Sequence, residues 1–139
     1  MSKQFTQVKQ ARKKIDGKGL ITGRPAYTDD TAPKDALVIK LVRSPHAFAR
    51  IKNIDTSKAL ELPGVETILT HKDVPRVPIT RAGQGHPEPS PKDKFILDEY
   101  VRHPGDEVAI IAAVDESTAE EAASLVEVEY EKLTPVLDM

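Results

Sequence analysis

The chain has 139 residues, of which 39% are hydrophobic and 30% are charged, with a formal net charge of -2. This balance is that of one globular domain, and it gives no overall indication of a nucleic-acid or membrane partner. The sequence contains no cysteine, which excludes disulfides, thiolate metal sites and cysteine nucleophiles.

Residues 1–18 are predicted to form a basic N-terminal arm, because lysine and arginine side chains cluster within residues 3–18. A solvated or docking segment is favoured over a nucleic-acid tail, since the cluster is short. Gly17, Gly19 and Gly23 are superficially similar to a dinucleotide-binding fingerprint. However, the third glycine comes one place too late and no hydrophobic strand precedes the run. We therefore interpret these residues as turn glycines.

Two extended runs follow. Residues 36–42 form a β-rich run with apolar residues on both faces, so we expect a strand that is buried on both sides. Residues 49–54 form the second run. Between them, Pro45 disfavours helix at Ser44, and the stretch from Ser44 to His46 is predicted to be a corner between two paired strands.

A short helix is predicted at about residues 56–62. Asp55 or Ser57 can cap its first turn. Pro63 and Gly64 can end it, with Gly64 in the left-handed conformation that many helix ends require. Residues 65–69 then indicate a third strand, and residues 71–75 indicate a single helical turn or a loop.

Residues 75–94 lose all periodicity and are predicted to form a Pro/Gly-rich loop. Five prolines and two glycines fall within this segment. A loop of this length is usually functional, disordered or held by a neighbour. We expect residues 76–94 to be poorly ordered in the isolated domain and ordered once a larger assembly holds them.

The last third of the chain predicts a strand, a helix and a strand. Unbroken apolar residues at 107–114 indicate a central strand that is covered on both faces. A helix at about residues 117–125 follows, with Ser117 and Glu120 as a capping box and an apolar stripe formed by Ala119, Ala122, Ala123 and Val126. From residue 126 to 131 apolar and acidic residues alternate, which indicates an outer strand with the solvated side chains Glu127, Glu129 and Glu131.

These three elements predict a right-handed βαβ unit. Residues 19–138 are thus predicted to form one α+β domain around a mixed β-sheet.

The histidines do not show a metal-binding pattern. None of His46, His71, His86 and His103 stands at a His-x-His or i, i+4 spacing from a further ligand. His71 and Asp73 can share one face of a strand, but two groups fall short of the three or four ligands of a zinc site. We therefore predict no metal site, and we interpret His46 as a corner residue that is hydrogen-bonded to backbone.

Two further clusters allow a functional and a structural interpretation. Asp29 and Asp30, with Asp35 nearby, would make an acid pair, but adjacent carboxylates in a Pro/Gly context are normally solvated. The segment 105–107 (Gly-Asp-Glu) would make a substrate loop, but a tight turn with Gly105 at positive φ is favoured. No nucleophile–base pair or Gly-x-Ser-x-Gly motif is recognisable. No catalytic or cofactor-binding residue is therefore assigned.

Seven motifs follow one another along residues 8–138. They are residues 21–30, 43–51, 54–60, 63–65, 69–75, 102–109 and 128–133. Taken in order, they resemble the large subunit of the molybdenum hydroxylases, the family of xanthine dehydrogenases and aldehyde oxidases. Residues 43–51 (Arg-Ser-Pro-His-Ala-Phe-Ala-Arg-Ile) are similar to that family's Ser-Pro-His-Ala-His-Ala-Arg-Ile corner, with Phe48 at a position where the family commonly has histidine. Residues 81–85 and 87–91 resemble a bacterial, xanthine-dehydrogenase-like branch, which favours purine or other N-heterocyclic substrates.

The resemblance implies the α/β hammerhead-like fold of the N-terminal a/b hammerhead domain. In the family, the large subunit holds a molybdopterin cofactor and hydroxylates a carbon beside nitrogen or oxygen, with water as the oxygen source. It passes electrons to iron–sulfur and flavin (FAD) domains or subunits. The family's cofactor-contacting loops and catalytic glutamate lie in later domains and have no counterpart here. The resemblance therefore implies a non-catalytic domain that binds no cofactor itself and packs against the molybdopterin-binding domains.

Two other hypotheses stay open. One is a free-standing structural or assembly module that reuses the fold; the other is an independent small enzyme, which the missing nucleophile, metal and phosphate motifs disfavour. We expect the chain to be a separated or truncated domain. A cytoplasmic location is also expected, because the apolar run from Val108 to Val114 is far below the roughly 20 residues of a membrane span and the N-terminus lacks a signal-peptide core.

Overall fold

The computed structural model describes residues 10–81 and 90–138, and it divides the chain into two compact units, residues 1–36 and 37–139. The first unit contains two short helices, α1 (Gly17–Ile21) and α2 (Thr28–Thr31). The interpretation of Gly17 and Gly19 as turn glycines is wrong, because both lie in α1. Gly23 does have the positive φ of a turn glycine, at 68°. The predicted boundary after residue 18 stays a prediction.

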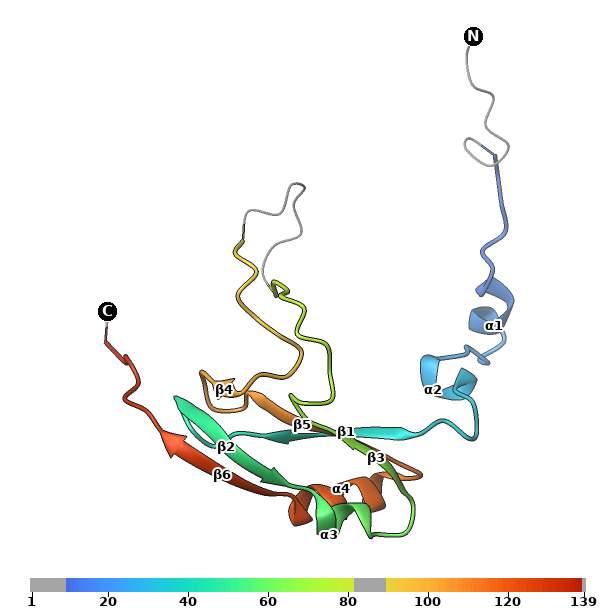
Figure 1. The fold of residues 1–139 in the computed structure, drawn as a ribbon. Helices are drawn as coiled ribbons and strands as arrows, with labels where there is room; N and C mark the ends of the chain where they lie inside the picture. Colours follow the sequence, from blue (N-terminus) through green and yellow to red (C-terminus); the bar gives the residue numbers. More distant parts are fainter. Residues whose placement is uncertain (1–9, 82–89, 139) are drawn as a thin grey trace. The chain divides into compact units, whose positions relative to one another are not determined.

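The second unit contains two three-stranded sheets (Figure 1). In the first sheet, β5 (Glu107–Ala113) lies between β1 (Val38–Arg43) and β3 (Val65–Leu69). In the second, β2 (Ala49–Asp55) lies between β4 (Tyr100–Val101) and β6 (Glu127–Lys132). All four strand pairings are antiparallel. The α+β class, with short helices beside the strands, is confirmed, but the described strands form two antiparallel sheets rather than the one mixed sheet that was predicted.

Two predicted connections between strands are wrong. β1 and β2 flank the corner at residues 44–46 but do not pair, because β1 pairs with β5 while β2 pairs with β4 and β6. β5 and β6 also lie in different sheets, so the strand, helix and strand of residues 107–132 are not a βαβ unit of one sheet. In both places the chain crosses from one sheet to the other.

Two helices cover one face of the β1–β5–β3 sheet (Figure 1). They are α3 (Ser57–Leu60) and α4 (Glu116–Leu125). Ala59 of α3 and Ala122 of α4 are fully buried and share a core with Ile68 and Ile111 of the sheet. Small side chains at these points let the helices lie close to the strands. The predicted apolar stripe of α4 is confirmed, because Ala119 and Ala122 are fully buried.

The helix α4 begins at a different cap from the one predicted. Asp115 is its N-cap residue, and the Asp115 carboxylate accepts the backbone N–H of Thr118 at 2.8 Å. Ser117 donates its hydroxyl to the same carboxylate at 2.9 Å, while Glu120 forms an ion pair with Lys40 on β1. The predicted capping box of Ser117 and Glu120 is therefore wrong, because the N-cap lies two residues earlier.

The signals predicted around α3 are present only in part, because the N-cap residue is Thr56 rather than Asp55 or Ser57 and makes no side-chain cap hydrogen bond. The Asp55 carboxylate accepts the backbone N–H of Ser57 at 2.9 Å, where the helix begins. Gly64 has a φ of 94° and so takes the expected left-handed conformation after the helix. Its carbonyl accepts the Val114 N–H at 2.9 Å, which holds this end of the α3 segment beside the end of β5.

A second core joins the two sheets. It contains Ala49 and Ile51 of β2, Val101 of β4 and Val108 of β5, all at most 4% exposed. Val42 of β1 packs against this core and against the core beneath the helices. β5 is thereby covered by the helices on one side and by the second core at Val108 on the other, while Ile110, further along that second side, is only half-buried. The predicted cover on both faces is therefore present only at the start of the strand.

The strand β1 is not buried on both sides, and that expectation is wrong. Lys40 and Val42 lie on the face that the helices cover, since Lys40 pairs with α4 and Val42 belongs to the helix-covered core. Ile39, which points to the other face, is 57% exposed. The same helix-free face is the one from which the chain between β3 and β4 projects (Figure 1).

We call this projecting segment, residues 75–99, the excursion. Of its predicted Pro/Gly-rich loop, residues 82–89 lie outside the described part of the chain. Its two arms meet at a β-bridge, where Ile79 and Lys94 exchange backbone hydrogen bonds of 2.7 and 3.1 Å. The expectation that residues 76–94 become ordered on assembly stays a prediction.

Candidate functional site

The corner at residues 44–46 carries the chain from one sheet to the other. Ser44 is 2% exposed; its N–H donates to the Asp106 carbonyl at 2.9 Å, and its carbonyl accepts the Gly105 N–H at 2.7 Å. The Ser44 hydroxyl oxygen accepts the N–H of His46 at 3.0 Å. The His46 ring packs edge-on against Tyr130, with ring centroids 4.8 Å apart. These contacts give His46 a packing role at the corner.

The segment 105–107 is a tight turn that opens β5. Gly105 has a φ of 89°, which agrees with the favoured structural interpretation. The next residue, Asp106, is only 5% exposed and accepts from the Arg102 N–H at 2.7 Å and from the Lys94 ammonium at 3.0 Å. Burial acts to raise the pKa of Asp106, but these hydrogen bonds outweigh it and hold the pKa below its ordinary value.

Asp98 is a second buried carboxylate, and it is not among the residues predicted from the sequence. It is 7% exposed and accepts from Arg102 at 2.8 Å and from Arg76 at 3.0 Å. Burial acts to raise the pKa of Asp98, and the two guanidinium groups reverse that effect. The i, i+4 spacing of Asp98 and Arg102 is the one sequence signal for this contact.

A third carboxylate, Glu107, binds the excursion from the start of β5. It accepts from Arg81 at 2.7 Å and lies 3.5 Å from Arg43. Arg76, Arg81 and Lys94 thus each place one cation of the excursion against a carboxylate of residues 98–107. These three ion pairs hold the base of the excursion in place. This structural role explains the charged groups, and no catalytic role is needed.

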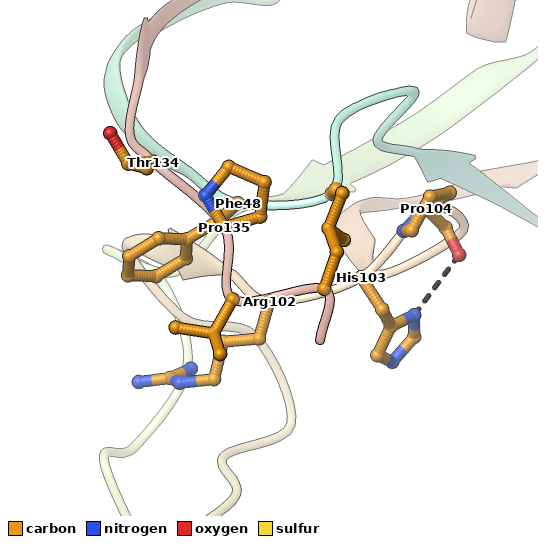
Figure 2. Close-up of a pocket in the computed structure, with 9 residues that line it drawn as sticks. Phe48, Arg102, His103, Pro104, Thr134 and Pro135 are labelled. Carbon is orange, nitrogen blue, oxygen red and sulfur yellow. Dashed lines mark hydrogen bonds between the residues drawn. The ribbon is translucent and has the colours of Figure 1, made fainter. Parts of the chain in front are cut away.

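A hollow of about 440 Å³ lies beside the corner (Figure 2). It is formed by three segments, namely residues 47–48 of the corner, residues 102–104 after β4, and residues 134–137 after β6. The backbone N–H of Leu133 donates to the Phe48 carbonyl at 3.0 Å and holds two of these segments together. Phe48 and Pro135 lie side by side in its wall (Figure 2).

Two polar side chains of this hollow, Arg102 and His103, are engaged within the domain. His103 places Nδ1 3.0 Å from the Pro104 carbonyl (Figure 2). Its Nε2 lies 3.2 Å from Asp106, and the Arg102 guanidinium binds Asp98. What remains open is mostly apolar, including Val136 at 92% exposure and Leu137 at 79%. The hollow therefore suits contact with an apolar surface better than acid–base chemistry.

The other predicted candidates are not brought together. His71 lies in a turn, with its Nδ1 buried and without a hydrogen-bond partner, and burial lowers the pKa of its ring. Asp73 turns back to accept from the backbone and hydroxyl of Thr70 at 2.8 and 2.7 Å. His86 lies outside the described residues. Within residues 10–81 and 90–138, no group of three or more potential ligands is placed to hold a metal ion.

The Asp29–Asp30 pair has a local structural role at its second member. The Asp30 carboxylate accepts the Tyr27 N–H at 2.9 Å at the start of α2. Asp35 is exposed. Asp30 and Asp35 are thus solvated as expected, but the interpretation of the acid pair as loop residues is wrong, because Asp29 and Asp30 lie in α2. In the described part of the chain, no helix is long and apolar enough to cross a membrane.

Comparison with known proteins gives a consistent set of matches. The family described as "Aldehyde oxidase and xanthine dehydrogenase, a/b hammerhead domain" matches residues 22–134. A probable hypoxanthine oxidase of Escherichia coli O157:H7 is 45% identical over 126 residues, which are 91% of this chain and 13% of that protein. A xanthine dehydrogenase molybdenum-binding subunit of the same organism is 42% identical over 128 residues, which are 89% of this chain and 17% of that protein.

A solved structure shows the same architecture. CO dehydrogenase from Oligotropha carboxidovorans superimposes with a TM-score of 0.69 and 39% sequence identity, over 91% of this chain and 15% of that chain. The chain thus spans between 13% and 17% of the length of these three proteins.

Proposed function

We propose that the chain is the non-catalytic N-terminal domain of a molybdopterin-dependent hydroxylase or dehydrogenase. The premise is that it belongs to the aldehyde oxidase and xanthine dehydrogenase family, in which it corresponds to the a/b hammerhead domain. In this proposal the domain packs against the cofactor-bearing domains of the same enzyme. Iron–sulfur and FAD groups belong to partner domains or subunits. The enzyme oxidises its substrate with water as the oxygen source.

The match along almost the whole chain supports the proposal. Nine tenths of the chain aligns with a small part of a much longer relative, at 45% identity. The family match covers residues 22–134, a range that contains the corner, both sheets and the base of the excursion. The shared feature is therefore the entire domain rather than one motif.

The hollow beside Phe48 does not fit a molybdopterin site. A cofactor with an anionic phosphate needs free cations or a cradle of backbone N–H groups. The arginine in the hollow beside Phe48 is bound to Asp98 instead, and the rest of that hollow is mainly apolar. We therefore place the cofactor, and every catalytic group, in the remainder of the enzyme.

The proposed substrate class is an N-heterocycle such as a purine. Two relatives with names that refer to hypoxanthine or xanthine support this choice, at 45% and 42% identity. The CO dehydrogenase match, at 39% identity, has the same domain on an enzyme for a different substrate. The domain therefore supports the reaction class more strongly than the substrate.

The test uses the natural polypeptide that contains these residues. It is purified from molybdenum-replete cells and analysed for molybdenum and molybdopterin, and its oxidation of hypoxanthine and of an aldehyde is followed with an artificial electron acceptor in ¹⁸O-labelled water. We expect molybdenum to co-purify in proportion to the protein, and the product to carry ¹⁸O. The 139-residue chain alone should show no turnover.

Other outcomes would favour the competing hypotheses. A natural polypeptide without molybdenum or molybdopterin would indicate a free-standing assembly module. Turnover by the isolated chain without added metal would indicate an independent small enzyme. The cytoplasmic location is part of the same proposal, and cell fractionation would test it.

A further inference from the structure

The two sheets differ in the character of their outer faces. In the β4–β2–β6 sheet the outward positions are charged, with Arg50 and Lys52 on β2 and three glutamates on β6, all exposed. This is the usual arrangement for an antiparallel sheet with one face in water. The helix-free face of the β1–β5–β3 sheet does not follow it.

That face consists of two cross-strand rows without a charged side chain. The strand register places Leu41, Ile110 and Leu69 in one row and Ile39, Ala112 and Thr67 in the other. The alternate residues Val42, Ile111 and Ile68 belong to the core beneath α3 and α4, so the two rows point away from the helices. Ile39 is 57% exposed and Thr67 is exposed, Leu41, Ile110 and Leu69 are half-buried, and Ala112 between them is buried at 6%.

Such a face is costly to leave in water. A contiguous apolar patch on a protein marks a surface that another element covers. Helices cover the opposite face of this sheet, and none of the helices described in residues 37–138 lies on this one (Figure 1). The absence of charge in both rows indicates an apolar partner surface rather than an acidic or basic one.

We infer that the domain docks through this helix-free face on an apolar surface of the cofactor-bearing remainder of its own enzyme. Ile39 is the most exposed apolar residue of the face. The inference rests on the proposed function. This chain covers only 13% and 17% of two close relatives, so most of each relative is polypeptide that is covalently joined to the equivalent domain. A tethered partner acts at a high effective concentration, which favours it over a second copy that must be captured from solution.

The experiment measures thiol reactivity in the natural full-length polypeptide. The 139 residues contain no cysteine, so the variants Ile39→Cys and Leu60→Cys each introduce one thiol into this domain. The two positions are matched, at 57% and 48% exposure in the domain, but Leu60 lies in the helix layer on the opposite side of the sheet. Each variant is pulse-labelled with iodoacetamide, and the modified peptide is quantified by mass spectrometry.

We expect the Ile39→Cys thiol to react at least about tenfold more slowly than the Leu60→Cys thiol in the folded enzyme, and equally fast in denaturant. Equal rates in a folded enzyme that contains molybdopterin would overturn the inference and leave the proposed function intact. A polypeptide without molybdopterin would reject both. If the Ile39→Cys thiol loses its protection on dilution, as a dimer dissociates, a second copy of the protein is the occupant. That result would also overturn the inference. If the Ile39→Cys enzyme does not fold, Leu37→Cys, at 44% exposure, replaces it.

Discussion

Gly64 meets two constraints at one position. Its φ of 94° lies where L side chains are strained, and an added Cβ would lie 2.8 Å from Cγ2 of Val114. We predict that Gly64→Ala lowers the free energy of unfolding by roughly 2–3 kcal/mol, because it combines backbone strain with a steric clash. Urea denaturation of both proteins measures the difference.

Gly105 supplies the control for that prediction. It has a similar φ of 89°, but nothing lies within 4 Å of an added Cβ. Gly105→Ala should therefore carry the backbone strain alone, roughly 1–2 kcal/mol. Equal losses for the two variants would show that the contact with Val114 contributes nothing.

Ser44 stabilises the corner through its hydroxyl group. This oxygen accepts the His46 N–H at 3.0 Å in a position that is 2% exposed. We predict that Ser44→Ala lowers the free energy of unfolding by roughly 1–2 kcal/mol, because a buried donor loses its acceptor. Burial raises the pKa of Tyr130 and a hydrogen bond with Ser44 opposes that rise, so the pKa of Tyr130 should increase further in the variant.

Ultraviolet titration and thermal unfolding measure these two effects. Ser124→Ala is the control, because its hydroxyl donates to the Glu121 carbonyl at an exposed site. That variant should leave both quantities close to the wild-type values. An unchanged Tyr130 titration in Ser44→Ala would contradict the assigned contact.

At the scale of single elements, Asp115 decides where α4 begins. Its carboxylate accepts the Thr118 N–H at 2.8 Å and the Ser117 hydroxyl at 2.9 Å. We predict that Asp115→Ala lowers the melting temperature by roughly 5 °C, because an N–H of the first turn loses its partner. Asp115→Asn should retain most of the stability, since the amide oxygen can still accept.

Ser117→Ala separates this cap from the capping box that the sequence favoured. It should lower the melting temperature by less than about 2 °C, because Ser117 lies inside the helix and is exposed. Circular dichroism of the three variants gives the comparison. A larger effect for Ser117→Ala than for Asp115→Ala would restore the capping box.

Most elements of residues 37–138 could be predicted from the sequence, because each has a local signal, but the short elements α1, α2 and β4 were missed. Alternation at residues 126–131 and the unbroken apolar run at 107–114 depend only on neighbouring residues, and both became strands. Strand partners could not be predicted in the same way. β1 pairs with β5 across more than 60 residues, and no local pattern in residues 38–43 distinguishes that partner from β2.

At the scale of the whole molecule, the candidate site was the least predictable part. The corner was recognisable from Ser44 and Pro45, but the hollow beside it combines residues 47–48, 102–104 and 134–137. Ion pairs such as Arg81 with Glu107 join residues 26 positions apart, and they depend on how the excursion folds back. Sequence patterns report periodicity along one element, whereas these sites are made where separate elements meet.

The buried carboxylates at the base of the excursion predict how the domain responds to acid. The pKa of Asp98 lies below its ordinary value of 3.8, because the hydrogen bonds from Arg102 and Arg76 outweigh the effect of burial. The unfolded chain therefore binds the proton more tightly than the folded one. The stability that Asp98 contributes is complete above its ordinary pKa, and it is lost as the pH falls through the lower folded pKa. Asp106 acts in the same direction.

We predict that the free energy of unfolding of the wild-type domain falls between about pH 5 and pH 2, more steeply than that of Asp98→Asn. At pH 7 Asp98→Asn should be less stable by roughly 1–3 kcal/mol, because Arg76 and Arg102 lose their charged partner, and this gap should narrow in acid. Urea unfolding at a series of pH values measures both curves, with Glu129→Gln, an exposed carboxylate on β6, as the control. Parallel curves for wild type and Asp98→Asn down to pH 2 would show that this carboxylate does not fix the base of the excursion.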